Sequence, residues 1–169
     1  MTERAMGAQR AAEAVEPQQV ADAVGVGMLK DDRASRALGM QVTAIGPGRA
    51  TLTMTVRDDM LNGFDICHGG FMTLLADSAF AFACNSRNAL TVAAGLDVEF
   101  IAPAHRGDVL TARANEVHLA GRNGLYDIEV TNQREERVAM VRGRSHRMKD
   151  REVVPLADAG FAPEPVPTK

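Results

Sequence analysis

The hydrophobic pattern of the chain changes near residue 69, where a continuous apolar run begins. From Gly69 to Asn85 apolar residues occupy every helical face, and Asp77 is the one charged side chain. A helix that is apolar on all sides is expected to be covered on all sides rather than to lie on the surface. The pattern therefore predicts a long buried helix over 69–85 with a carboxylate in its middle.

Segments on both sides of this helix alternate between apolar and polar residues, as half-buried strands do. One strand is predicted before the helix, from Thr51 to Val56, after a Pro47-Gly48 turn. Four more are predicted after the helix, and a strong hairpin signal at 121–124 separates two of them. The four runs are 92–101, 109–119 with a change of phase near Asn115 that suggests a bulge, 126–131 and 137–146.

These elements predict an α+β fold in which a curved antiparallel sheet wraps around one long central helix. Strands joined by short turns are mostly antiparallel, and an all-round apolar helix needs the cover that such a sheet provides. The 169 residues suffice for one domain with a substantial core and are too few for two. The expected domain spans 28–149. Residues 1–27 are expected to be a flexible extension, either a loose helix or disordered, and 150–169 a Pro-rich flexible tail.

Composition and charge exclude several classes of function. The net charge is −3 without a long basic block, which argues against a nucleic-acid partner. No charge-free apolar run approaches 18 residues, so no membrane span is predicted. The N-terminus lacks a compact hydrophobic segment, and Cys67 and Cys84 are too few for a disulfide framework. A reducing, cytoplasmic setting is therefore the default expectation.

The residues that can carry chemistry lie within 16 positions, from Asn62 to Asp77. Gly69 and Gly70 open the helix, and without a Cβ they let a ligand approach the backbone closely. The first helical turn offers free N–H donors and a partial positive charge, which suit a carbonyl oxygen that becomes negative in a transition state. A buried carboxylate such as Asp77 has either a structural ion-pair partner or a chemical use, and we favour the chemical use.

The spacing of these groups predicts a dimer. Asp77 lies seven residues beyond Gly70, which is about 10 Å along the helix axis. Oxyanion donors and a base or nucleophile must both lie roughly 3 Å from one reacting group. One helix does not easily provide both, so the donors of one subunit are expected to meet Asp77 of another. Two antiparallel central helices related by a twofold axis give two equivalent sites at the interface.

Simpler structural roles are open for several residues. Taken alone, His68 is better explained as a helix cap or a satisfied core group, and Asn62-Gly63 as an ordinary turn. Both cysteines are interpreted as buried small residues, and no residue spacing resembles a metal site, so neither a metal nor another cofactor is expected. Arg142, Arg144 and His146 share one strand face. The two arginines are either part of a solvated edge or attract the phosphates of a nucleotide-bearing substrate.

At these positions the sequence resembles the hotdog-fold acyl-CoA thioesterases of the phenylacetate-degradation type, the hydroxyphenylacetyl-CoA thioesterases. The resemblance covers roughly 35–148 and leaves the N-terminal extension and the Pro-rich tail outside. His-Gly-Gly alone is a modest signal, but its combination with the spaced Asp77 is specific. The matching segments are 60–63, 67–70, 75–81, 83–86, 126–129 and 142–147.

The resemblance implies a hotdog dimer, paired again into a homotetramer, that hydrolyses aryl- or arylacetyl-CoA thioesters. By the family pattern, Asp77 is the general base or nucleophile, and the Gly69 N–H of the partner subunit polarises the thioester carbonyl. Asn62 orients water or the thioester, while His68 supports the loop or contacts substrate. The segment 64–66 departs from the family pattern and leaves the acyl preference open. The residues expected to contact substrate are Gly70, Phe64, Ser78, Arg142 and Arg144.

Two other functions remain open at this stage. A hotdog hydratase or dehydratase acting on an enoyl thioester needs an acid/base pair near the α and β carbons of the substrate. His68 is the one candidate for a second titratable group near Asp77. A non-catalytic acyl-CoA-binding module would instead bind its ligand tightly without releasing a thiol.

Overall fold

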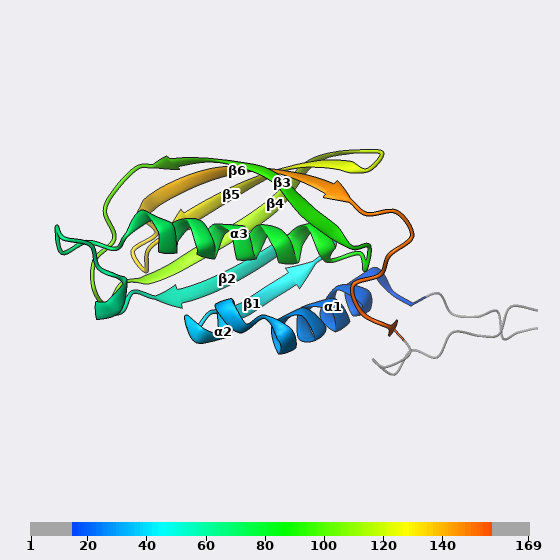
Figure 1. The fold of residues 1–169 in the computed structure, drawn as a ribbon, viewed down its shortest axis with the longest axis horizontal. Coiled ribbons are helices and arrows are strands. Elements are labelled where there is room, and N and C mark those ends of the chain that lie inside the picture. The colour runs from blue at the N-terminus through cyan, green and yellow to red at the C-terminus, as the bar shows by residue number, and fades with distance from the viewer. Residues whose placement is uncertain (1–14, 157–169) are drawn as a thin grey trace, which may run out of the picture.

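The computed structural model describes residues 15–156, which form one curved antiparallel sheet around a long helix (Figure 1). The six strands follow the order β1-β2-β4-β5-β6-β3, and each neighbouring pair is antiparallel. The predicted α+β class and the sheet wrapped around one central helix are confirmed. The elements are α1 (Pro17–Asp31), α2 (Arg33–Ala37), β1 (Gln41–Gly46), β2 (Arg49–Thr55), the 3-10 turn η2 (Asp58–Met60), α3 (Gly69–Asn85), β3 (Thr91–Phe100), β4 (Val109–Ala120), β5 (Asn123–Thr131) and β6 (Arg137–Arg147).

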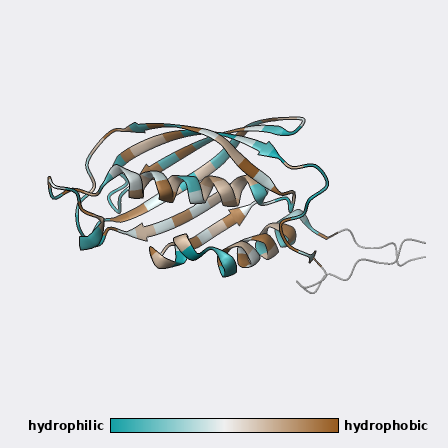
Figure 2. Cartoon of the chain, viewed as in Figure 1, coloured by the Kyte–Doolittle hydropathy of each residue, from teal (hydrophilic) through white to brown (hydrophobic). Residues whose placement is uncertain are grey.

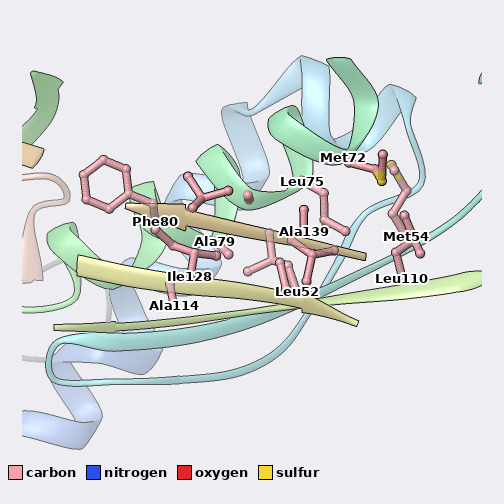
Figure 3. Close-up of a cluster of buried hydrophobic side chains, with 14 of the residues drawn as sticks. Leu52, Met54, Met72, Leu75, Ala79, Phe80, Leu110, Ala114, Ile128 and Ala139 are labelled. Carbon is pink, nitrogen blue, oxygen red and sulfur yellow. The ribbon is translucent and has the colours of Figure 1, made fainter. Parts of the chain in front are cut away.

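Helix α3 has the bounds that its apolar run predicts, and its inner face forms the core with the sheet. Figure 3 shows Leu75 and Phe80 of α3 facing side chains of β2, β4 and β5, among them Leu52, Leu110 and Ile128. Full burial of one such side chain contributes roughly 1.5–3 kcal/mol. This layer therefore fixes the position and direction of α3 on the sheet.

One face of α3 is not covered within the single chain. Positions three and four residues apart on this face are partly or fully exposed, namely Gly70, Thr73, Leu74, Asp77 and Ala81. The expectation of a helix covered on all sides is therefore wrong for one chain, because the sheet passes around only part of the helix (Figure 1). Figure 2 shows mostly pale and brown residues along α3, so the open face is not strongly hydrophilic overall.

The structure contains an edge strand, β1, that alternation does not predict. Its register against β2 shifts between Val42 and Ala44. Because of this irregularity, the two residues of β1 that pack on the core, Val42 and Ile45, are three positions apart rather than two. The phase change predicted in β4, by contrast, is confirmed, since the register with β5 shifts between Glu116 and His118.

Strand β3 forms the other edge of the sheet and pairs only with β6. Its outer edge carries unpaired backbone groups, and several apolar side chains on and just beyond it are exposed, including Val92, Phe100 and Ile101. An exposed edge with apolar side chains is a template for pairing with another strand. This edge is a second surface, besides the open face of α3, that one chain leaves uncovered.

The expectation of a flexible extension over 1–27 is wrong from Pro17 onward, and residues 1–14 lie outside the described part. Helix α1 packs against β1 and α3 and buries Ala21 and Val24 completely. Its start is encoded locally, because Pro17 occupies the first helical position and the Gln19 side chain accepts the Glu16 N–H at 3.3 Å. The expected boundary at residue 27 therefore falls inside a packed helix.

The first residues of the expected flexible tail are also held in place. The Asn88 side chain accepts the Val153 and Val154 N–H groups at 3.2 and 2.9 Å and donates to the Val154 carbonyl at 3.0 Å. This anchors the segment beside α1, where Val154 lies against Gly27. The tail prediction is thus wrong for 150–156, and residues 157–169 lie outside the described part. No helix within residues 15–156 is long and apolar enough to cross a membrane.

Because Val24 is fully buried, we expect Val24→Ala to lower the free energy of unfolding by about 2 kcal/mol, through lost burial and the cavity that remains. Val26→Ala on the same helix is the matched control, since Val26 is 74% exposed and should change stability by less than about 0.5 kcal/mol. Urea unfolding measures both. Equal effects at the two positions would contradict a packed α1.

Candidate active site

The start of α3 is built by His68, which precedes the first helical residue. Its Nδ1 accepts the Gly70 N–H at 3.1 Å, and its carbonyl accepts the Phe71 N–H at 2.9 Å. The interpretation of His68 as a helix cap is therefore confirmed. The Gly69 N–H has no hydrogen-bond partner within the described part of the chain. One donor at the positive end of α3 is thus left available to a ligand.

A groove of about 590 Å³ opens at this helix start. It brings together four residues that the sequence places in the site: Asn62, His68, Gly69 and Gly70. The facing wall is apolar and consists of the end of β3 and the residues after it, 100–103. An apolar groove with a few polar groups at one end is typical of small-molecule sites.

Phe100 is a groove residue that the sequence did not predict as part of the site. In the predicted strand 92–101 it alternates with Asp97 and Glu99, and in the structure its side chain is 55% exposed. A Cβ placed on Gly69 would lie only 2.7 Å from Cζ of Phe100. The ring therefore rests directly against the helix start, and the absence of a side chain at Gly69 makes this approach possible.

The loop before α3 is closed by backbone hydrogen bonds and holds Asn62 in a turn. The Asn62 N–H donates to the Ile66 carbonyl at 2.9 Å, and the Asn62 Oδ1 accepts the Phe64 N–H at 2.9 Å. The turn role of Asn62 is confirmed, while its side-chain NH₂ group has no partner among residues 15–156. Phe64 lies in this loop and is 86% exposed, and it does not line the groove.

The Asp77 carboxylate lies half-buried on the open face of α3. No hydrogen bond or salt bridge to it occurs among the described side chains, and burial raises the pKa of the Asp77 carboxyl above its usual value. The structural alternative, an internal ion pair, is therefore absent from this part of the chain. An unpaired, desolvated carboxylate next to apolar surface is a candidate base or nucleophile.

A single chain does not bring Asp77 to the groove. The carboxylate is eight residues beyond Gly69, about 12 Å along the axis, and it does not line the groove. The predicted separation between the helix start and Asp77 is therefore present in the structure. Each group lacks a partner within its own chain.

Ser78 is not brought to the groove or to the face of Asp77. Its buried hydroxyl lies 3.0 Å from that of Ser35, which donates to Asp32 at 2.6 Å. This chain of hydrogen bonds joins α3 to the beginning of α2. The structure does not support the prediction that Ser78 contacts substrate, because the hydroxyl already takes part in packing two helices together.

Arg142 and Arg144 lie on the outer face of the sheet. They alternate along β6 with buried residues, and Gly143 between them contacts the Phe80 ring of α3. Arg142 binds Asp127 with two hydrogen bonds of 2.8 and 2.9 Å, and Arg144 pairs with Asp97. The expected contact of these arginines with substrate is not supported, because both face away from α3 and carry paired charges.

The two cysteines are buried, as expected for small core residues. Burial raises the pKa of both thiols, that of Cys84 to about 12, so neither is a thiolate at neutral pH. No group of three His, Cys, Asp or Glu side chains suited to a metal ion occurs among residues 15–156.

Comparisons with known proteins agree with this geometry. The model of the thioesterase superfamily matches residues 64–139. Acyl-coenzyme A thioesterase PaaI of Escherichia coli is 45% identical over 121 residues, which cover 72% of this chain and 86% of the relative. The solved structure of the E. coli PaaI protein, from the phenylacetic acid degradation operon, has a TM-score of 0.77 at 41% identity and covers 79% of this chain and 96% of that one. A mutant structure of PaaI from Thermus thermophilus gives a TM-score of 0.67 at 38% identity, covering 69% and 100%.

The capping role of His68 predicts a specific response to substitution. His68→Ala should lower the free energy of unfolding by about 1 kcal/mol, because the Gly70 N–H loses its acceptor. His68→Asn should recover most of this loss, since Asn is a favoured N-cap residue. Chemical denaturation of the three proteins measures the difference. Equal stability of the Ala and Asn variants would show that the ring does not act as a cap.

Proposed function

Because the chain belongs to the thioesterase superfamily, alongside the PaaI acyl-coenzyme A thioesterases, we propose that it uses Asp77 and the start of α3 to hydrolyse acyl-CoA thioesters. The products are a free acid and coenzyme A, and the substrates are phenylacetyl-CoA-like. The observation that carries the proposal is the pair of unpartnered groups on one helix, the Asp77 carboxylate and the Gly69 N–H.

The active site in this proposal is shared between two chains. A thioester carbonyl at the helix start lies about 12 Å along the axis from Asp77 of the same chain, so the carboxylate of a partner subunit must supply the second half. The open face of α3 and the free edge of β3 support a homodimer, since both carry exposed apolar side chains that a second copy would cover. The homotetramer implied by the resemblance remains a prediction.

The reaction follows from the charges of the two groups. The Gly69 N–H of one subunit donates to the thioester oxygen and stabilises the negative charge that develops there. Asp77 of the other subunit either removes a proton from the attacking water or attacks the carbonyl carbon to form an anhydride, which water then opens. The thiolate of coenzyme A is a good leaving group, so no general acid is needed. In this proposal the Asn62 side-chain NH₂, which has no partner among residues 15–156 and lines the groove, orients the thioester or the water.

The walls of the groove favour an aromatic acyl group. Ile66, Met72, Phe100 and Ile101 contribute apolar surface next to the helix start. Aromatic rings pack well in such a site, with offset or edge-to-face contact to another ring such as that of Phe100. This supports an arylacetyl thioester over a polar acyl group.

The hydratase alternative receives no support from the surroundings of Asp77. It needs a second titratable group near the carboxylate, and the Nδ1 atom of His68 is used in the helix cap. Cys84 is close enough to feel the charge of Asp77, but its pKa of about 12 makes it a poor proton donor or acceptor at neutral pH. A measurement of thiol release distinguishes the thioesterase from a non-catalytic acyl-CoA-binding module, because only the enzyme releases coenzyme A as a free thiol.

Asp77→Asn tests the carboxylate directly. With phenylacetyl-CoA and a thiol-trapping reagent, we expect kcat to fall by at least two orders of magnitude while the circular dichroism spectrum is unchanged. The wild-type kcat/KM should fall on acidification through a pKa above the ordinary value of about 3.9, because the ionised carboxylate is active and burial raises its pKa. Near-normal turnover by the variant would remove Asp77 from the mechanism.

The oxyanion donor can be removed without changing the helix. Gly69→Pro deletes the N–H at the first helical position, where Pro is well tolerated, and His68 already has the extended conformation that Pro requires before it. Gly69→Ala is the matched control, because it adds the same Cβ against Phe100 but keeps the N–H. We expect Gly69→Pro to lower kcat by about 10²–10³ relative to Gly69→Ala. Similar kcat values for the two variants would contradict the donor role.

The shared site also predicts complementation between the two inactive variants. When Gly69→Pro and Asp77→Asn chains are refolded together, each mixed dimer contains one site with both substitutions and one with neither. Roughly a quarter of wild-type activity should then return for random pairing. A mixture as inactive as its components would place both groups in one chain.

A further inference from the structure

The sheet surface of this protein carries many arginines, and most of them are neutralised by acids. Arg113, Arg134, Arg137, Arg142 and Arg144 each lie within salt-bridge distance of a carboxylate. A different arrangement is found at the end of the molecule that lies away from the start of α3. There, three arginines have no carboxylate within 4.0 Å in the described part of the chain: Arg122, Arg147 and Arg151.

These three arginines and Lys149 line one groove of about 640 Å³, and we call the four residues the basic cluster. Arg122 lies in the turn between β4 and β5, and the other members end β6 or follow it. Figure 1 shows this turn and the end of β6 at the same end of the molecule, near the C-terminal end of α3. The groove at the start of α3 lies at the opposite end of the helix.

The backbone beneath the basic cluster is held by hydrogen bonds. The Arg147 N–H donates to the Arg122 carbonyl at 2.8 Å, which places the two arginines side by side. Leu90 holds the following segment, because its carbonyl accepts the Met148 N–H at 2.8 Å and its N–H donates to the Arg151 carbonyl at 2.9 Å. Backbone hydrogen bonds thus hold the cluster at the end of the sheet.

The charge of the groove favours a multiply charged anion. Asp150 and Glu152 also line it, so four cations stand against two carboxylates. The closest contact between them is long, at 3.9 Å between Lys149 and Asp150. Guanidinium groups bind phosphate oxygens with two parallel hydrogen bonds, and a groove with a positive excess concentrates such ligands.

We propose that the basic cluster binds the phosphate groups of the coenzyme A moiety of the substrate. The proposal rests on the thioesterase function above. From Asp77 to the end of α3 at Asn85 is about 12 Å, and the groove begins just beyond, at Asn88. An extended pantetheine arm spans a comparable length. A thioester held at Asp77 of one chain therefore places its nucleotide over the basic cluster of that same chain.

The test compares two thioesters of one acid. Arg122→Gln/Arg147→Gln should raise KM for phenylacetyl-CoA at least tenfold with little change in kcat, because the lost contacts lie far from the reacting atoms. With phenylacetyl-pantetheine, which lacks the nucleotide, the same variant should keep the wild-type kcat/KM. Higher salt should raise the wild-type KM for phenylacetyl-CoA more than that of the variant.

Arg134→Gln/Arg137→Gln is the matched control. It removes the same number of charges, and its two arginines lie at the start of β6 and just before it, against Glu136 and Glu129. The control should leave KM for both thioesters unchanged. An equal rise in KM for the two thioesters, an equal rise in the control, or no rise in the cluster variant would overturn the proposal.

Failure of the proposed function gives a different result. If the wild type hydrolysed neither thioester, the hydrolytic assignment would be wrong, and calorimetric binding of free coenzyme A would decide on the basic cluster. At least tenfold weaker binding by Arg122→Gln/Arg147→Gln than by the wild type would retain the phosphate site. Equal binding by the two proteins would reject it.

Discussion

The packing of one face of α3 into the curved sheet is the constraint on which the rest of the structure depends. Phe80 packs on Gly143 of β6 and on the ring of Tyr126, and a Cβ at Gly143 would lie only 3.0 Å from the Phe80 ring. These contacts fix the rotation of the helix about its axis. Once the inner face is fixed, Asp77 must lie on the open face and the first helical turn at the rim of the sheet. The position of the candidate chemistry is thus a consequence of core packing.

The pattern of apolar and polar residues predicted the helices and strands whose burial follows one regular period along their length. The bounds of α3 follow from its composition alone, and the bulge in β4 follows from a change of phase. Strand β1 was missed because a register shift sets its two core contacts, Val42 and Ile45, three positions apart. For residues 1–27 the sequence predicts a loose helix or disorder, because nothing local shows that Ala21 and Val24 are buried against the rest of the fold.

In the candidate site, the spacing of some residues is set by the helix itself, whereas the contacts of others depend on residues distant in sequence. The separation of Asp77 from Gly69 is set by the helical rise, so the sequence predicted it. Ser78 instead contacts the hydroxyl of Ser35, and Arg142 forms an ion pair with Asp127. Both partners are far away in sequence, so only the folded chain reveals these contacts. For that reason the sequence predicts the spacing of the helix start and the carboxylate, whereas it does not reveal the partners that hold Ser78 and Arg142.

The unpaired carboxylate links catalysis to assembly in the proposed dimer. In the single chain, burial raises the pKa of the Asp77 carboxyl, so ionisation of this group lowers the stability of the fold. The loss of stability develops as the pH rises from the ordinary pKa of the unfolded chain to the raised pKa of the folded chain, and it persists at higher pH. In the proposed dimer the positive end of a facing α3 would offset part of this rise in the pKa, because it favours the anion over the acid. The interaction that polarises a substrate carbonyl would therefore also stabilise the ionised Asp77 of the partner. In the proposed dimer, a chain whose open helix face carries no charge except Asp77 would gain from a second copy both the stabilisation of that charge and the missing half of its active site.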